Sequence, residues 1–165
     1  MLGLWPGELK DLRQALPFAA YGQGPVLSTP FKTARVSAAI AAGGRMPQGR
    51  WVRNEANSRN QAPVEILPRP NAELIARAMR AVVTAGTARR AMAGTTLSIA
   101  GKTGTAQVDH GPPHAWFTGF APYDGDPSRR LAFAVVIEHG GYGGRAAAPV
   151  AREVMEAAQQ LGILP

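Results

Sequence analysis

The stretch from residue 94 to residue 139 constrains the fold of this chain most. Its apolar residues alternate with polar or small ones in two segments and form a nearly continuous run in a third: 96–101, 116–121 and Leu131–Ile137. Such a continuous run is typical of a strand buried on both faces. The connectors 109–113 and 123–127 are rich in Gly, Pro and Asp and therefore predict turns. We predict three consecutive strands that form an antiparallel meander.

Apolar residues at helical spacing predict helices before and after this sheet. Thr29 is the expected N-cap of the first helix, with Pro30 at a position where a missing N–H is harmless, and Gly43-Gly44 ends it. Asn71 is the expected cap of a second helix that ends near Gly86. In the first helix, Phe31, Ala34, Ala38 and Ala41 are expected to share one face, and in the second Leu74, Ile75, Ala78, Met79 and Val82. A last helix is expected from about Pro149. Its shared face would hold Val150, Ala151, Val154, Met155, Ala158 and Leu161.

The fold class predicted from these patterns is α+β, an antiparallel β meander with covering helices. Along the chain we expect a loop-rich lead-in with at most a short helical piece, a mainly helical part, a sheet and a C-terminal helix, over residues 1–21, 22–93, 94–139 and 140–165. Within the helical part, residues 45–70 are polar and Pro-containing and predict a long loop. One or two further helical turns are expected in 87–93.

Composition bounds the class of protein. A chain of 165 residues with 45% hydrophobic residues is expected to form one globular domain, and 19 Gly and 14 Pro predict many loops. No apolar run approaches the length of a membrane span, and the first residues lack the pattern of a signal peptide. Without cysteine, disulfides, thiol nucleophiles and Cys-based metal sites are excluded. The net charge of +7 comes from 15 arginines and 3 lysines that are scattered, which favours a solvated basic surface over a nucleic-acid site.

The motif Lys102-Thr103-Gly104-Thr105 stands where the first predicted strand continues. The ammonium of Lys102 supplies positive charge, the hydroxyls of Thr103 and Thr105 can donate hydrogen bonds to a carboxylate, and Gly104 lets a peptide backbone lie against the strand edge. Gly-Lys-Thr also suggests a phosphate-binding loop. That motif needs a glycine where Thr96 stands and a helix after the Lys-Thr, so the phosphate-loop hypothesis fails on both counts.

Several other short blocks stand in a definite order around this motif: Gly22-Gln23-Gly24, Thr29-Pro30, Gly43-Gly44, Gly86-Thr87-Ala88, Lys102–Gln107, His114–Pro122, the glycine cluster 140–144, and Ala146–Glu153. In order and spacing they closely resemble the C-terminal half of the transpeptidase domain of penicillin-binding proteins, especially the monofunctional class B type. The match runs from about Gly22 to Leu161, nearly the whole chain. It is specific because separate blocks agree in order.

The resemblance implies part of the serine β-lactamase and penicillin-binding-protein transpeptidase fold, and a parent enzyme that cross-links peptidoglycan by serine acyl transfer. On that basis Lys102 and Thr105 are the candidate catalytic residues, and Thr103, Gly104 and Thr105 the candidate substrate-binding residues. The backbone N–H at Thr105 would be one oxyanion-hole donor. No cofactor or metal is implied. The expected partners are the peptidoglycan stem peptide, β-lactams and the missing N-terminal half of the domain, with no nucleic acid. The parent is expected at the extracytoplasmic face of the bacterial inner membrane, in cell division or cell shape.

The family's nucleophile motif, Ser-x-x-Lys, is not found, and neither is Ser-x-Asn in its proper place. None of the serines (28, 37, 58, 98 and 128) has a lysine three positions later. Ser58-Arg59-Asn60 fits Ser-x-Asn by letters but follows the Gly-Gln-Gly block, which it precedes in the family. Thr29-Pro30-Phe31-Lys32 is better explained as a helix start. We therefore expect this chain alone to be inactive, because it carries one wall of the site without the nucleophile.

Two alternatives share parts of this evidence. A β-lactamase or β-lactam sensor has the same fold and motifs, although the Gly-Gln-Gly and Phe-Ala-Pro blocks favour the transpeptidase. A non-catalytic basic binding module would account for the charge, but scattered arginines argue against it. His110 and His114 lie in a Pro-containing loop without a third ligand, so no metal site is expected there. Trp116, Phe117 and Phe120 are assigned to the core rather than to a stacking platform.

The missing half of the domain has a predicted consequence for stability. In the family, two further strands continue beyond the strand that matches Leu131–Glu138. Without them, this strand would be an unprotected edge and a template for aggregation. Leu74, Met79 and Val82 are likewise expected to be exposed.

Overall fold

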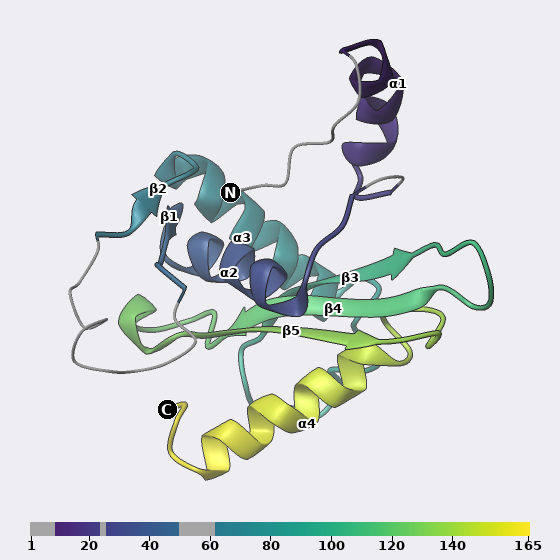
Figure 1. Ribbon diagram of the computed structural model, residues 1–165. Helices are drawn as coiled ribbons and strands as arrows, with labels where there is room; N and C mark the ends of the chain where they lie inside the picture. Colours follow the sequence, from purple (N-terminus) through teal and green to yellow (C-terminus); the bar gives the residue numbers. More distant parts are fainter. Residues whose placement is uncertain (1–8, 24–25, 50–61) are drawn as a thin grey trace.

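The computed structural model describes residues 9–23, 26–49 and 62–165. Its elements in chain order are α1 (Leu9–Ala19), α2 (Pro30–Ala41), β1 (Arg45–Met46), β2 (Val64–Glu65), α3 (Arg69–Thr84), β3 (Ala100–Ala106), β4 (His114–Ala121), a 3-10 turn η2 (Pro127–Arg129), β5 (Leu131–Ile137) and α4 (Ala147–Gln160). The predicted α+β class is confirmed. Figure 1 shows a central sheet between helical layers, with α1 projecting away from the rest.

The sheet is the predicted antiparallel meander, in the order β3-β4-β5. In its register Lys102 of β3 stands opposite Thr118 of β4, which in turn stands opposite Ala134 of β5. The bounds of β5 match the apolar run Leu131–Ile137. Within the described residues β3 and β5 each pair with β4 alone, so both are edge strands.

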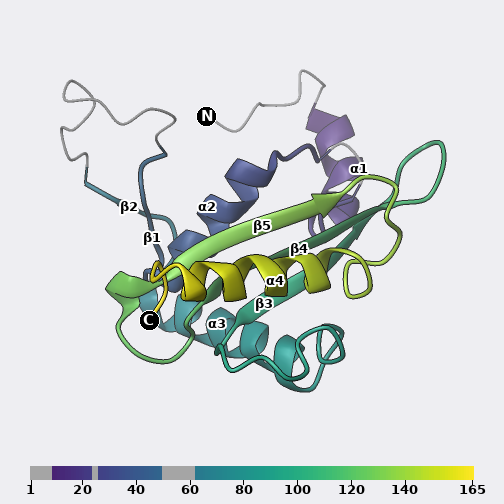
Figure 2. The same cartoon turned by 90° about the horizontal axis from the view of Figure 1, so that it is seen from below.

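Helices cover the two faces of this sheet. α2 packs on β4 and β5 and α3 packs on β3, while α4 packs on β4 and β5. Figure 2, seen from below, shows α4 crossing one face, with α2 and α3 on the other side of the strands. Phe117 and Phe120, both fully buried, anchor the cores on the two faces, the α4 side and the α2–α3 side respectively. Their assignment to the core is confirmed.

The helix predicted after Thr29 is α2, and it begins as predicted. The Thr29 side chain accepts a hydrogen bond from the backbone N–H of Lys32 at 3.2 Å, and Pro30 opens α2. The cap predicted for the second helix is wrong, because α3 already begins at Arg69. Its N-cap is Pro68, which makes no side-chain cap, so Asn71 lies inside the first turn.

The buried faces of the helices differ from those predicted. α3 buries Ala72, Ala76, Met79 and Val83, and α4 buries Ala147, Ala148, Ala151, Met155 and Ala158. The larger residues Leu74, Ile75, Val150, Val154 and Leu161 are exposed. Alanine lets a helix lie close to the sheet, so stripes dominated by alanine face the strands here. Of the residues expected to be exposed, Leu74 is exposed, Val82 is half-buried, and Met79 is buried, contrary to the expectation.

Four local predictions also need correction. The lead-in contains an eleven-residue helix, α1, which is more than a short helical piece. The expected loop 45–70 holds the two-residue strands β1 and β2, which pair with each other, and the start of α3. β5 is only half-buried at most positions, because one of its edges has no described neighbour. After Gly86, hydrogen-bonded turns extend to Gly94 without a regular helix.

None of the helices described is both long and apolar enough to span a bilayer.

Candidate functional site

The motif Lys102–Thr105 occupies the middle of the edge strand β3. The side chain of Lys102 is exposed, and Thr103, Gly104 and Thr105 are half-buried. The predicted pairing with β4 is present, since Thr103 stands opposite Phe117 and Gly104 opposite Trp116. The strand continues to Ala106 and then turns back, with no helix after the Lys-Thr. The phosphate-loop hypothesis is therefore excluded by structure as well as by sequence.

Two of the blocks singled out in the sequence meet the motif in space. The side-chain amide of Gln23, from Gly22-Gln23-Gly24, donates to the backbone carbonyl of Thr105 at 2.9 Å. The hydroxyl of Thr87, from Gly86-Thr87-Ala88, lies 2.7 Å from the hydroxyl of Thr103. Lys102 itself donates from Nζ to the carbonyl of Thr103 at 2.7 Å. Side chains far apart in sequence thus gather along one short piece of strand.

The glycine cluster before α4 packs against the backbone of this strand. A Cβ at Gly143 would overlap the carbonyl oxygens of Trp116 and Gly104. A Cβ at Gly144 would overlap the carbonyl oxygen of Thr87 and lie 3.6 Å from the Cγ2 of Thr103. Neither glycine has a positive φ, so close approach rather than backbone freedom explains both of them.

A buried chain of hydroxyls lies beside the motif and was not predicted. Ser37 of α2, 1% exposed, lies 2.7 Å from the hydroxyl of Thr118, which donates to the carbonyl of Phe133 at 2.9 Å. Since Thr118 uses its proton on that carbonyl, Ser37 is the donor between the two hydroxyls. The only sequence signal is a serine on an alanine-rich helix, and its partner is 81 positions away.

The histidines form a different pair from the one considered in the sequence. His114 meets His139 edge to face, with ring centroids 4.9 Å apart, and its Nδ1 accepts from the backbone N–H of His139 at 2.9 Å. His139 follows β5 and has a positive φ of 52°. No group of three or more His, Cys, Asp or Glu side chains that could hold a metal ion occurs among the described residues.

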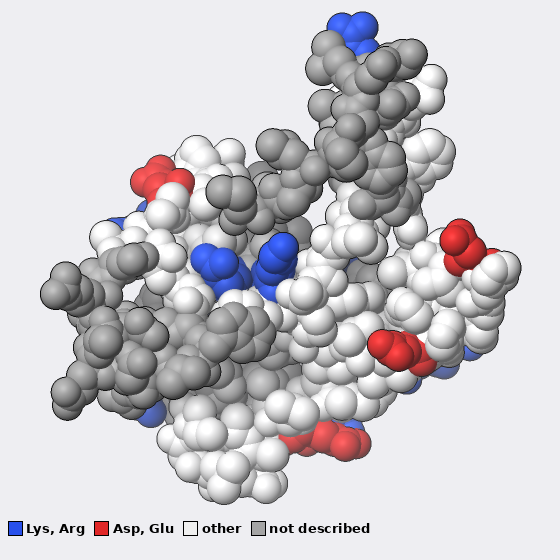
Figure 3. All heavy atoms as spheres, viewed as in Figure 1, with Lys and Arg blue, Asp and Glu red and all other residues white. Residues whose placement is uncertain are grey.

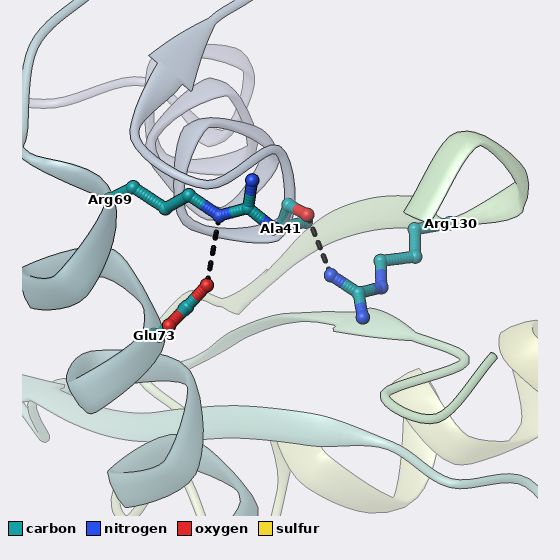
Figure 4. Close-up of polar contacts among 4 residues, drawn as sticks. All are labelled: Ala41, Arg69, Glu73 and Arg130. Carbon is teal, nitrogen blue, oxygen red and sulfur yellow. Dashed lines mark hydrogen bonds and ion pairs between the residues drawn. The ribbon is translucent and has the colours of Figure 1, made fainter. Parts of the chain in front are cut away.

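A cavity of about 910 Å³ lies away from the motif, near the connection between β4 and β5. Figure 4 shows two of its polar contacts: Arg130 donates to the carbonyl of Ala41 at 2.7 Å, and Arg69 pairs with Glu73 at 2.9 Å. These contacts tie the end of α2 to the sheet and stabilise the start of α3. No residue of the motif lines the cavity, so we do not assign the site to it.

In that same connection, the backbone N–H of Ser128 donates to the Asp126 carboxylate at 2.8 Å. This hydrogen bond, and a smaller one from the Ser128 side chain, lower the pKa of Asp126 below its ordinary value.

On the face drawn in Figure 3, Lys and Arg lie in small groups, two of them side by side near the centre, and acidic side chains lie mainly toward the edges, so no large continuous basic patch is seen among the residues coloured there. Lys32 is an exposed residue of α2, as its interpretation as a helix residue requires. Ser58 and Asn60, the apparent Ser-x-Asn match, lie outside the described residues.

This chain is similar in sequence to known penicillin-binding proteins. The family model for the penicillin-binding protein transpeptidase domain matches residues 8–156. The peptidoglycan D,D-transpeptidase MrdA of Haemophilus influenzae is 40% identical over 101 residues, which is 51% of this chain and 15% of the relative. The peptidoglycan D,D-transpeptidase PbpA of Mycobacterium tuberculosis is 44% identical over 73 residues, 39% of this chain and 14% of that protein.

Solved structures show the same likeness over nearly the whole chain. Penicillin-binding protein PBP2 from Helicobacter pylori superposes with a TM-score of 0.80 at 25% identity, over 99% of this chain and 32% of the other. Penicillin-binding protein A from M. tuberculosis, solved as a ceftriaxone acyl-enzyme complex, gives 0.71 at 30% identity, over 87% and 35%. The chain therefore spans about a third of each of these solved chains. Matched in sequence from residue 8 to residue 156 and in fold beyond that, it belongs to the transpeptidase-domain family of penicillin-binding proteins.

Proposed function

We propose that this chain supplies the Lys-Thr-Gly wall of a peptidoglycan D,D-transpeptidase site and that residues 1–165 act as the C-terminal portion of such a domain. The observation that carries the proposal is the meeting of Gln23, Thr87 and Lys102–Thr105 on one edge strand. Family membership supports it, since relatives of this chain are named as peptidoglycan D,D-transpeptidases.

In the proposed reaction a serine hydroxyl attacks the penultimate D-Ala carbonyl of a stem peptide. The serine oxygen–carbon bond forms, the peptide bond to the terminal D-Ala breaks, and that D-Ala leaves as the free amino acid. An amine of a neighbouring stem then attacks the ester and releases the serine. The Lys102 ammonium lies beside the reacting groups, the Thr103 and Thr105 hydroxyls hold the terminal carboxylate, and the Thr105 N–H is one oxyanion donor. Gly104 leaves room for the substrate backbone.

The serine of this reaction must come from outside this sequence, because none of its serines has a lysine three positions later. The free edge of β5 is the place we propose for the N-terminal half of the domain, whose strands would continue the sheet there. We place the assembled enzyme at the extracytoplasmic face of the inner membrane, where its substrate lies.

Reconstitution tests this proposal. The chain is co-expressed with a segment that carries the Ser-x-x-Lys and Ser-x-Asn motifs of a transpeptidase domain, and the complex is treated with a fluorescent penicillin. We expect label on the segment only when this chain is present, and its loss with Lys102→Ala but not with Lys32→Ala, a matched lysine on the exposed face of α2. A complex that forms but labels equally well with Lys102→Ala would refute the assigned role of β3. Rapid hydrolysis of the penicillin by the complex would instead favour the β-lactamase alternative.

A further inference from the structure

We infer that Thr87 is a positioning residue that orients the hydroxyl of Thr103 toward a bound carboxylate. The inference rests on the proposed function, because Thr87 can orient Thr103 toward a carboxylate only if Thr103 binds one. Thr87 belongs to the turn after α3, fifteen positions before Lys102, and no role in binding follows from its place in the sequence.

The geometry places Thr87 directly against the motif. The two hydroxyl oxygens are 2.7 Å apart, the usual distance for a hydrogen bond between hydroxyls. Thr103 is half-buried and Thr87 exposed, so the pair lies at the surface of the site, where a ligand can reach it. Among the side-chain contacts of the described residues, the Thr103 hydroxyl has Thr87 as its partner.

The turn that carries Thr87 is held in place from two sides. The backbone N–H of Ala88 donates to the carbonyl of Val82 at 3.1 Å, which ties the turn to the end of α3. On the other side, a Cβ at Gly144 would overlap the Thr87 carbonyl oxygen. This close approach leaves Thr87 little freedom to move away, so its hydroxyl presents a fixed partner to Thr103.

The direction of the hydrogen bond follows from the ligand. A hydroxyl carries one proton, and a carboxylate accepts hydrogen bonds but cannot donate them. When Thr103 gives its proton to a carboxylate, it can only accept from Thr87. Thr87 must therefore be the donor, and its donation aims the Thr103 proton at the ligand and increases its polarity. Serine at position 87 would preserve this arrangement, and valine, of the same shape, would abolish it.

The test uses the 165-residue chain and two probes, Nα,Nε-diacetyl-L-Lys-D-Ala-D-Ala and the same peptide with a C-terminal carboxamide. Dissociation constants come from NMR titration of the Thr103 and Thr105 amide signals. Thr87→Val is expected to weaken binding of the carboxylate peptide about fivefold to tenfold, as for loss of one neutral hydrogen bond between hydroxyls. Thr87→Ser is expected to stay close to the parent chain, and the affinity for the carboxamide should be the same in all variants.

Two controls separate positioning from folding. Thr84→Val removes an exposed hydroxyl that donates within α3, to the carbonyl of Arg80, and should leave both affinities unchanged. In a Thr103→Val background, Thr87→Val should have no further effect on the carboxylate peptide. The inference is overturned if Thr87→Val binds the carboxylate peptide as tightly as the parent chain does. It is also overturned if Thr87→Val weakens the binding of both peptides equally.

Failure of the proposed function has a different signature. If the parent chain does not prefer the carboxylate over the carboxamide, Thr103 is not a carboxylate ligand, and both the proposed function and the role of Thr87 in binding are overturned. In that case the side-chain coupling constants of Thr103 still test whether Thr87 orients its hydroxyl. If χ1 of Thr103 becomes averaged in Thr87→Val but not in Thr87→Ser, Thr87 orients the Thr103 side chain. If χ1 is unchanged in Thr87→Val, Thr87 has no orienting role.

Discussion

The hydroxyl of Ser37 lies 2.7 Å from that of Thr118, although 81 positions separate the two residues. Ser37 is the buried polar residue of α2, and Thr118 stands opposite Lys102 in the sheet. The contact fixes the height of α2 over the central strand, next to the strand that carries the motif.

This hydroxyl chain predicts an order of stability losses. Thr118→Val leaves the buried Ser37 hydroxyl and the Phe133 carbonyl without their partner, which should lower the free energy of unfolding by about 2–3 kcal/mol. Ser37→Ala removes only the outermost hydroxyl of this series of hydrogen bonds and leaves the bond from Thr118 to Phe133 intact. It should therefore lower the free energy of unfolding by about 1 kcal/mol. Urea unfolding measures both, with the exposed hydroxyl of Ser28→Ala as control. Equal effects of Thr118→Val and Ser28→Ala would contradict the assignment.

Close packing of the glycine cluster predicts that Gly143→Ala is harmful. Its Cβ would overlap backbone oxygens of β3 and β4, which cannot move without shifting both strands, so we expect a loss of about 2–3 kcal/mol. Gly125→Ala is the control: it has open space around it and a φ of +89°, so it should lose only about 1 kcal/mol through backbone strain. Amide shifts at Gly104 should change in the first variant alone. Tolerance of Gly143→Ala would show that the loop is free to retreat.

The absence of Ser-x-x-Lys predicts that this chain does not react with β-lactams by itself. No serine has the neighbouring lysine that would act as its base. Intact mass spectrometry after incubation with a penicillin should show the unmodified chain. A stoichiometric adduct on any serine would mean that a nucleophile is present after all.

The Asp126 carboxylate predicts a local pH dependence. A lowered pKa means that the folded chain favours the ionised form, so Asp126 stabilises the fold above its ordinary pKa of 3.8, and this contribution is lost as the pH falls through the lowered value. Carboxyl NMR should give a midpoint below 3.8. Ser128→Ala removes only the smaller, side-chain hydrogen bond and should raise the midpoint partway. A midpoint at or above the ordinary value would contradict the capping contact.

The unpaired edge of β5 predicts self-association. Its outward-facing amides have no partner among the described residues, and the strand Leu131–Ile137 carries no charge. We expect light scattering to show a mass that rises with concentration. Hydrogen exchange of the β5 amides should become slower as the protein concentration rises. A monodisperse monomer with a sharp cooperative melt and fast exchange in β5 would identify the chain as self-sufficient.

Local sequence patterns predicted the parts of the fold that depend on near neighbours. The apolar run gave the bounds of β5, and Thr29-Pro30 gave the start of α2, because a strand and a helix cap are each encoded within a few residues. The motif was found with its strand for the same reason. Asn71 failed as a cap because Pro68 and the helical backbone from Arg69 start α3 earlier.

What the sequence did not reveal depends on contacts between distant elements. The inward faces of α3 and α4 are decided by how closely each helix approaches the sheet, which favours alanine and leaves Leu74 and Val154 outside. The contact of Thr87 with Thr103 likewise forms only when the turn after α3 lies against β3, and that of His114 with His139 only when β4 and β5 are in register. No spacing in the sequence encodes them.

The hydrogen bond from Gln23 to the carbonyl of Thr105 has a thermodynamic consequence for any peptide that approaches this strand. That oxygen has two lone pairs, so an N–H of the peptide either takes the second one or displaces the amide of Gln23, and Lys102 engages the carbonyl of Thr103 in the same way. Where a donor is displaced, binding is an exchange in which the released amide or ammonium returns to water. The measured affinity of a peptide therefore reports the difference between two sets of hydrogen bonds, and shortening Gln23 to Asn should shift it without any change in the peptide.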